Sequence, residues 1–357
     1  MVYQESGGCN PCLHPLVHGL GFLLMSNKPV SITSKVVLQL VVWIPLLGTA
    51  YAIFSLWGRF ITPVDLTLLV VGYILCALGI TIGYHRMLTH KGFEAPGWIR
   101  GFFLICGSMA FQGPALNWAA THIQHHANSD DDMDPHSPVK SFFHGHVGWI
   151  LDDFRPDVER YAGPLLKDKL VVFISKTFLF WALLSLAIPF AVGYAFGGLK
   201  GGLYGFLWGG LVRMFLNHHV TWAVNSVCHT YGGREFVTTD ASRNNFVIGL
   251  LAMGEGWHNN HHAFPRSANH GMHWWQIDPS AYVIGGLEKV GLIKKVVRIA
   301  PERLAIRRIQ ADVVEERDVL PGVVLPSVIM EHGTAMAAAA TTVAEVVSHA
   351  AAQQPTL

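Results

Sequence analysis

The 357-residue sequence contains little charge. Lysine, arginine, aspartate and glutamate make up 14% of it, whereas an ordinary soluble domain carries about 25%. The formal net charge is only +1, so the basic excess of a nucleic-acid-binding protein is missing and we expect no nucleic-acid partner. Because 51% of the residues are hydrophobic, the shortage of charge indicates a membrane protein rather than a soluble enzyme.

Cysteine is also scarce, with five copies in the chain. Cys9 and Cys12 form a single C-x-x-C pair, and the other cysteines lie in or beside apolar runs. A disulfide framework or a structural zinc site would need more paired ligands than this. We expect residues 1–35 to form a cytoplasmic tail with reduced thiols, without a cleavable signal because its apolar patch is short.

Long apolar runs, in contrast, are abundant. Four runs each come close to the ~20 residues that span the hydrocarbon core of a bilayer. They cover residues 36–57, 66–84, 170–196 and 203–224. Short polar or glycine-rich connections join the first pair and the last pair, so each pair predicts a helical hairpin. We therefore predict an all-α integral-membrane fold with four transmembrane helices in two hairpins and a cap of shorter helices. Residues 98–111 are apolar but too short to cross, and predict an interfacial or re-entrant helix.

Basic residues indicate which way the chain faces. The predicted hairpin tips hold only Arg59 and Lys200, whereas the segment between the hairpins holds eight lysines and arginines. By the positive-inside bias, the cap and both termini of this multi-pass protein face the cytoplasm. The main domain is predicted over residues 36–300, followed by a charged segment, residues 301–334, and a low-complexity tail, residues 335–357.

Histidine is the residue in excess, with 20 copies, and three clusters of it fall on the predicted cytoplasmic side. They are His85-x-x-x-x-His90, His122-x-x-His125-His126 and His258-x-x-His261-His262. On an α-helix, positions i, i+3 and i+4 lie within about 100° of one another, so each of the last two clusters presents three imidazoles on one face. The first pair would lie about 140° apart, which suits either a helix end or ligation of two different metals.

These clusters supply eight nitrogen donors, which is more than one metal needs and about enough for two. Imidazole binds zinc, copper, iron and nickel, so the spacing leaves the metal open. Other histidines are expected to be surface or core residues, and His218 and His219 are expected in the interior of the helix bundle. A metal transporter is the alternative of another class, but it would place ligands inside several spans.

Further motifs surround the histidines. They are Gly83–His90, Asp134–His136, Ser141–Trp149, Thr221–His229 and Gly254–Pro265. Together they resemble the membrane fatty-acid desaturase family, and within it the acyl-CoA branch of the stearoyl-CoA type, in the form without a fused cytochrome domain. The resemblance covers roughly residues 36–295.

The resemblance implies a di-iron centre that is held by histidines. The implied iron ligands are His85, His90, His122, His125, His126, His229, His258, His261 and His262. Asn225 is implied to hold a water at one iron. The resemblance also implies a bent acyl tunnel, with Gln112, Trp118, Thr221 and Trp222 near its kink. For the two tryptophans, anchoring at the membrane interface is the alternative.

The implied activity is that of a fatty-acyl desaturase. It would use O2 and two electrons at two iron ions to introduce a cis double bond, expected at the ninth carbon of an acyl-CoA chain. In the acyl-CoA branch, polar residues that contact CoA precede the second histidine cluster, whereas this chain has Gly113, Ala120 and Thr121 at those places. An acyl-lipid substrate therefore stays open, as does a membrane di-iron hydroxylase. The chain lacks the His-Pro-Gly-Gly motif of a fused haem domain, so we expect a separate electron donor, either ferredoxin or a b-type cytochrome with its NAD(P)H reductase.

Overall fold

The computed structural model describes residues 32–56, 61–152 and 154–308, and the regular structure within them is helical. No strand forms in these ranges, where β-pairing is limited to isolated bridges such as that between Glu94 and Lys294. The all-α prediction is therefore confirmed for this part of the chain. The C-x-x-C pair, most of the N-terminal tail and the low-complexity tail lie outside the described residues.

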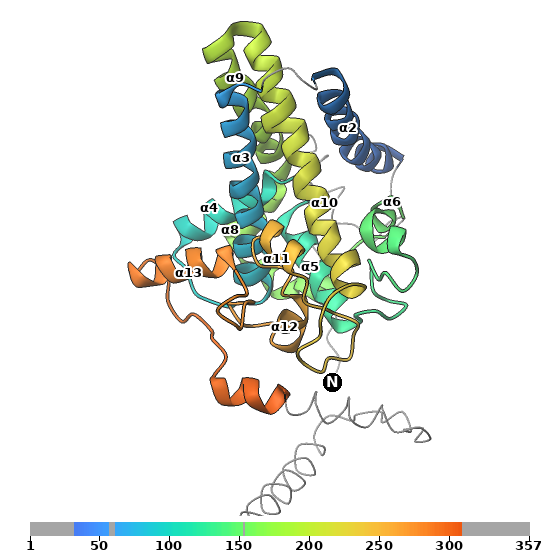
Figure 1. Ribbon diagram of the computed structural model, residues 1–357, viewed down its shortest axis with the longest axis vertical. Coiled ribbons are helices and arrows are strands. Elements are labelled where there is room, and N and C mark those ends of the chain that lie inside the picture. The colour runs from blue at the N-terminus through green and yellow to red at the C-terminus, as the bar shows by residue number, and fades with distance from the viewer. Residues whose placement is uncertain (1–31, 57–60, 153, 309–357) are drawn as a thin grey trace, which may run out of the picture. The chain divides into compact units, whose positions relative to one another are not determined.

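Four long helices form the apolar part of the fold (Figure 1). They are α2 (Ile32–Leu56), α3 (Pro63–Leu78), α9 (Phe178–Gly205) and α10 (Arg213–Ser226). Two π-helical segments extend them, η1 (Gly79–Thr89) after α3 and η4 (Phe206–Val212) between α9 and α10.

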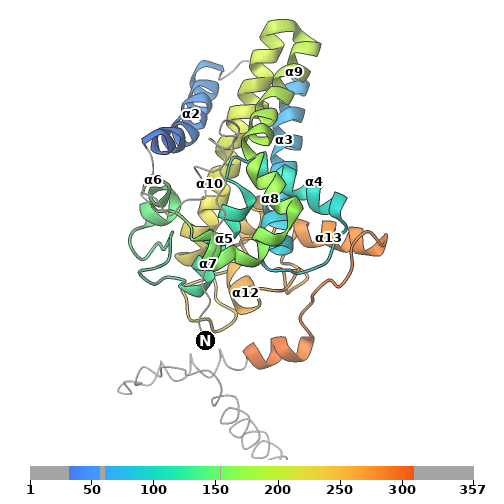
Figure 2. The same cartoon turned by 180° about the vertical axis from the view of Figure 1, so that it is seen from behind.

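Shorter helices gather around the ends of α3 and α10. They are α4 (Gly97–Ser108), α5 (Ala115–Ala127), η2 (His144–Gly148), α6 (Trp149–Leu151), α7 (Val158–Ala162), η3 (Gly163–Lys167), α8 (Lys169–Lys176), η5 (Val227–His229), α11 (Phe246–Leu251), α12 (His258–Ala263) and α13 (Pro279–Lys289). In Figure 2, α7 and α8 lie beside α5, which they contact.

Three helical segments of the described chain are long and apolar enough to cross a membrane. They are Ile32–Phe54, Pro63–Thr89 and Phe178–His229. The third has 52 residues, and a straight helix of that length would measure roughly 80 Å, far more than the ~30 Å hydrocarbon core. It is not straight, because Gly197 and Gly198 have non-helical backbone angles. The φ of Gly198 is 58°, in the left-handed region that glycine adopts readily.

The two arms on either side of this glycine pair pack against each other. A Cβ on Gly193 would collide with the carbonyl group of Gly201, and a Cβ on Gly205 would collide with the carbonyl group of Pro189. Residues eight or more positions apart in one straight helix could not touch in this way. The chain therefore turns back on itself, in the glycine-rich stretch that predicts a hairpin tip, and Figure 1 shows both arms side by side.

The third apolar run departs from the prediction. Instead of one helix over residues 170–196, two helices meet at Thr177, and only α9 belongs to a candidate membrane segment. Asp168 caps α8, whose buried Val171 and Ile174 belong to the main hydrophobic core. An apolar run does not distinguish a helix in lipid from a helix packed on protein. The prediction therefore placed one membrane span over residues that form two helices.

The lower end of α3 continues as the π-helix η1, which packs closely on α4. A Cβ on Gly79 would collide with the backbone of Gly107, and a Cβ on Gly83 would lie 2.7 Å from the carbonyl oxygen of Phe103. The backbones of the two helices therefore approach without intervening side chains. α4 occupies most of the stretch 98–111 and is too short to cross a membrane, as predicted.

Candidate metal centre

Nine histidines from four segments of the chain converge in two adjacent clusters. The first cluster contains His85, His90, His122, His126 and His261. The second cluster contains His125, His229, His258 and His262. Within each cluster the candidate ligand nitrogens lie within 4.8 Å of one another, close enough to bind a common metal ion.

Each H-x-x-H-H motif is divided between the clusters. On α5, His122 and His126 are one helical turn apart and belong to the first cluster, while His125 belongs to the second. On α12 the division is reversed, and only His261 joins the first cluster. The helical face predicted from the spacing is therefore shared by two sites, which lie side by side.

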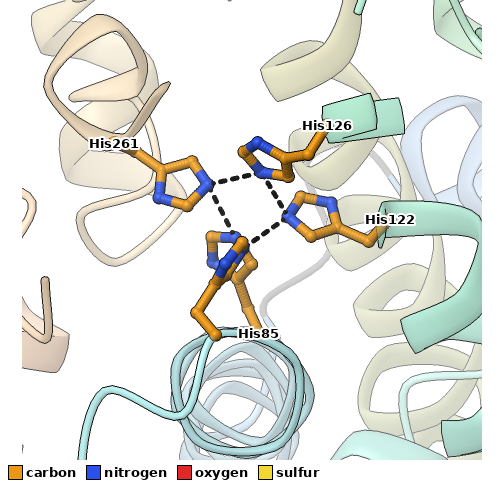
Figure 3. Close-up of side chains that lie close together, drawn as sticks. His85, His122, His126 and His261 are labelled. Atoms are coloured by element: carbon orange, nitrogen blue, oxygen red, sulfur yellow. Dashed lines mark hydrogen bonds between the residues drawn. The ribbon is translucent and has the colours of Figure 1, made fainter. Parts of the chain in front are cut away.

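The first cluster is closed by contacts between Nε2 atoms. In Figure 3 the rings of His85, His122, His126 and His261 point toward a common centre. The Nε2 atom of His261 lies 3.1 Å from that of His85 and 2.9 Å from that of His126. The Nε2 atom of His90 lies 3.0 Å from that of His122.

His85 and His90 belong to the same cluster because η1 is a π-helix. The backbone N–H of His90 donates to the carbonyl oxygen of His85 at 3.0 Å, the i to i+5 pattern of a π-turn. The wider turn brings residues five apart onto one side, whereas a regular α-helix would separate them. The sequence left open whether the two residues lie at a helix end or bind two different metals. In the structure they lie at the end of the α3–η1 helix and belong to one cluster.

Carboxylates orient four of the nine rings through Nδ1. The pairs are His85 with Glu255 at 2.7 Å, His125 with Asp134 at 2.9 Å, His229 with Asp130 at 2.9 Å and His262 with Asp240 at 2.6 Å. A carboxylate that accepts from Nδ1–H leaves Nε2 as a lone pair. In the second cluster the Nε2 atoms of His125 and His262 face each other at 3.4 Å without a proton between them. Such an arrangement repels itself unless a cation lies at its centre, so the donor set fits a metal ion.

Burial favours the neutral form of six of the imidazoles. It lowers the pKa of six of them well below the ordinary value of 6.5, namely His90, His122, His126, His258, His261 and His262. Nearby imidazoles lower these pKa values further. Metal binding requires the neutral ring, so the protein environment prepares the ligands before a metal arrives.

The spacing of the histidines indicated no role for the four carboxylates. Asp134 and Glu255 stand in two of the family motifs, but Asp130 and Asp240 are far in sequence from the histidines that they contact. Asp130 also accepts a hydrogen bond from the backbone of Ala241 at 2.7 Å, which ties two loops together beneath the second cluster. Only the folded chain brings these groups together, so no spacing pattern could have found them.

Several other histidines lie outside the two clusters. His136 is buried against His125, with ring centroids 4.4 Å apart. His218 is buried inside the bundle, as predicted, and donates to a backbone carbonyl at 3.0 Å. His219 contacts His146 at 3.0 Å, away from both clusters.

A cavity adjoins both clusters. Its wall includes His85 and His122 of the first cluster and His258 of the second. From the histidines it continues between α3 and α10, where it is lined mainly by apolar side chains. Its apolar lining and its course along the helices suit a hydrocarbon chain.

Three of the four predicted tunnel residues are linked by hydrogen bonds. The amide of Gln112 donates to the hydroxyl of Thr221 at 2.8 Å and accepts from the indole of Trp118 at 3.2 Å. Thr221, Trp118 and Asn225 line the cavity. Trp222 is buried and packs on neighbouring histidines of α10 instead.

Two histidine clusters at the ends of apolar helices, beside an elongated cavity, are typical of a histidine-rich membrane protein that binds metal. Residues 63–286 match the family model described as fatty acid desaturase, so the chain belongs to the fatty acid desaturase family. The family predicted from the sequence is thereby confirmed.

Relatives within the family differ in substrate. The chain is 40% identical over 236 residues to the icosanoyl-CoA 5-desaturase of Limnanthes douglasii, covering 65% of this chain and 64% of that protein. It is 37% identical over 230 residues to the sn-1 stearoyl-lipid 9-desaturase of Anabaena variabilis, covering 64% and 82%. It is 42% identical over 223 residues to the chloroplastic palmitoyl-monogalactosyldiacylglycerol delta-7 desaturase of Arabidopsis thaliana, covering 61% and 58%. Two of these matches span less than two thirds of the relative's length.

Proposed function

We propose that the protein is an integral-membrane, oxygen-dependent fatty-acyl desaturase that introduces a cis double bond at the ninth carbon of a saturated chain. The observation that carries this proposal is the pair of histidine clusters at one end of the apolar cavity. Family membership and the names of the relatives support the reaction class. The position of the double bond rests on the dimensions of the cavity.

The first and second clusters would each hold one iron ion, with Asn225 placing a water at one of them. When bound, the two irons would supply the oxidising chemistry. In the overall reaction one O2, two external electrons, two protons and two hydrogens from adjacent methylenes would give one double bond and two water molecules. The protein's own residues hold the acyl chain and exclude bulk water. Trp118, Gln112 and Thr221 fix the wall beside the histidines through their hydrogen bonds, which determines the carbons presented there.

The depth of the cavity limits the methyl end of the chain. Tyr73 and Asn217 line the cavity on the side away from the histidines, so they mark its far end. Along α10 and η5, Asn217 lies twelve residues before His229 of the second cluster. Twelve residues correspond to roughly 18 Å of helix. Subtracting about 4 Å for van der Waals contact at each end leaves roughly 10 Å. At ~1.3 Å per methylene, projected from a carbon–carbon bond of ~1.5 Å, the cavity holds about eight carbons beyond the reacting pair.

This length favours some relatives' substrates over others. A stearoyl chain with a double bond at carbon 9, as in the name of the Anabaena relative, has eight carbons beyond it. A palmitoyl chain with a double bond at carbon 7 has the same number, which makes that reaction the second candidate. An icosanoyl chain with a double bond at carbon 5 would require fourteen.

The same proposal extends to the membrane topology and the electron source. Together with α2 and α3–η1, the two arms around Gly197 and Gly198 would make four crossings in two hairpins, with the cap and both termini in the cytoplasm. The apolar length of the candidate segments and the basic residues between hairpins support this arrangement. Electrons would come from a separate protein, ferredoxin or a b-type cytochrome with its NAD(P)H reductase.

The test is expression in a host that lacks desaturases, followed by mapping of double bonds in its fatty acids. Wild type should yield double bonds at carbon 9 of stearoyl and palmitoyl chains. Tyr73→Ala removes the ring at the far end and should extend the products to longer chains, whereas Tyr51→Ala, an exposed residue of α2, should not. Hydroxylated fatty acids from wild type would instead identify a hydroxylase. Double bonds only at carbon 5 would contradict the cavity argument.

A further inference from the structure

The helix α11 (Phe246–Leu251) is hydrogen-bonded to a candidate membrane helix. It belongs to the connection between α10 and the last histidine motif, yet the hydroxyl of Tyr73 donates to the carbonyl oxygen of Leu251 at 2.7 Å. Tyr73 is near the middle of the candidate membrane segment Pro63–Thr89. In Figure 1, α11 stands beside α3 and α10. The end of α11 is therefore tied to a residue of a candidate membrane helix.

The outer face of α11 is apolar and exposed. Phe246, Val247 and Leu250 are 50%, 60% and 45% exposed, and the helix contains no charged residue. The neighbouring helix α3 also exposes apolar side chains, among them Val70, which is 45% exposed. The exposed face of α3 fits the hydrocarbon of a bilayer, and the uncharged, apolar face of α11 fits contact with lipid as well.

The inner side of the same segment forms part of the acyl cavity. Ala252 directly follows α11 and lines the cavity together with Tyr73. Ile248 is buried among Ala223 and Val224 of α10. The segment from α11 to Ala252 thus has the cavity on one side and an apolar outer surface on the other, and the hydrogen bond from Tyr73 joins it to α3.

We infer that α11 is a wall between the acyl cavity and the lipid, and that the chain to be desaturated enters through it while attached to a membrane lipid. The inference rests on the proposed function and names its substrate class. A lipid-bound chain already lies in the hydrocarbon and reaches the cavity once the Tyr73–Leu251 hydrogen bond opens.

The first experiment measures the depth of α11 in the complete protein, reconstituted in phosphatidylcholine vesicles. A nitroxide is attached to Val247→Cys in a background with Cys9→Ser and Cys12→Ser, since the other three cysteines are buried. Val70→Cys on α3 is the control for lipid, and the exposed Lys295→Cys is the control for water. Dissolved oxygen should relax the label at residue 247 more than a water-soluble nickel chelate does, as at residue 70. A label that behaves like the one at residue 295 would overturn the inference.

The second experiment follows the chain itself. Vesicles contain phosphatidylcholine whose sn-1 stearoyl chain carries a diazirine, and irradiation should label the peptide that contains Leu251 and Ala252. Tyr73→Phe keeps the ring but removes the hydrogen bond, so labelling at Ala252 should rise about fivefold, the factor expected for one neutral hydrogen bond. The control Tyr51→Phe should leave it unchanged. Labelling confined to Val247, with no effect of Tyr73→Phe, would show that lipid only surrounds α11.

A parallel assay separates this inference from the proposed function, and it is supplied with O2, NAD(P)H and each candidate electron donor, ferredoxin and a b-type cytochrome, with its reductase. If wild type in vesicles converts stearoyl-CoA but not the stearoyl phospholipid, the desaturase proposal stands and lateral access from lipid is wrong. If it converts the phospholipid, both stand. If neither substrate yields an unsaturated product while the protein contains iron, the desaturase proposal itself fails.

Discussion

At the scale of single residues, the position of one proton decides whether an imidazole can bind metal. In the second cluster, His125, His229 and His262 each contact an aspartate through Nδ1, so their Nε2 atoms are free for a metal. The carboxylate also restrains the ring, which reduces the entropy lost when the metal binds.

The first prediction concerns Asp240, which lies 2.6 Å from Nδ1 of His262. Replacement by Asn keeps the size but weakens acceptance from the ring, so the iron affinity of the second cluster should fall about 10–100-fold. Titration with a competing chelator measures it. Asp152→Asn, which removes a charge next to His144 on the surface, is the matched control and should leave affinity unchanged. Equal affinities in the two variants would argue against an orienting role for Asp240.

A second prediction concerns His126, whose Nε2 contacts those of both His122 and His261. His126→Ala should abolish desaturation and reduce bound iron from two ions to about one per chain, because only the first cluster loses a donor. His144→Ala should retain both ions. Elemental analysis of purified protein checks this, and full iron content in His126→Ala would remove His126 from the ligand set.

The residues of the site were predictable to different degrees. Spacing alone indicated His122, His125 and His126, because i, i+3 and i+4 share a helical face. His229 stands alone in its segment, so only the resemblance to a family indicated it. Glu255 contacts Nδ1 of His85 in the first cluster. The two residues are distant in sequence, so no local pattern predicts the contact.

At the scale of helices, the π-turn of η1 and its contact with α4 place the first two ligands. From the spacing of His85 and His90, about 140° apart on a regular helix, the prediction left open a helix end or ligation of two different metals, because the π-turn is not visible in the sequence. The apolar run around Thr177 was likewise taken as one helix, because hydrophobicity alone does not mark the point where a helix leaves the bundle. Glycines, however, correctly located the turn at Gly197.

The third prediction tests the close contact of η1 and α4. Gly79→Ala would place a Cβ against the backbone of Gly107, which cannot move without shifting α4, so unfolding free energy should fall by about 1–3 kcal/mol or more. Gly101→Ala, in α4 itself, meets only a side-chain carbon of Leu170 at 3.9 Å. That control should be neutral or stabilising by about 0.5–1 kcal/mol, because alanine favours the helix. Thermal unfolding in detergent compares them, and equal melting temperatures would refute tight packing.

At the scale of the whole molecule, the apolar bundle and the histidine clusters make opposite demands on their surroundings. The candidate membrane segments expose apolar side chains, whereas the clusters bury nine polar rings in a small volume. Without a metal, the nitrogen lone pairs that face each other repel one another, and this repulsion raises the free energy of the folded state but not that of the unfolded state. Metal binding removes that cost, so removal of iron by a chelator should lower the melting temperature even though the helices remain.

The final prediction concerns pH and the metal-free protein. Burial lowers the pKa values of His258, His261 and His262 well below 6.5 in the folded state, whereas the unfolded chain retains that ordinary value. As pH falls below 6.5, the unfolded state therefore takes up protons that the folded state does not, and the free energy of unfolding decreases. The melting temperature of the chelator-treated protein should be constant above about pH 7.5 and fall steadily toward pH 5.5, by more than that of the iron-loaded protein. Bound iron excludes protons from the Nε2 atoms until it dissociates, which delays the loss. If the melting temperature of the metal-free protein stays level or rises on acidification, the rings must be charged in the folded state. The conclusion that burial keeps these imidazoles neutral before metal binds would then be wrong.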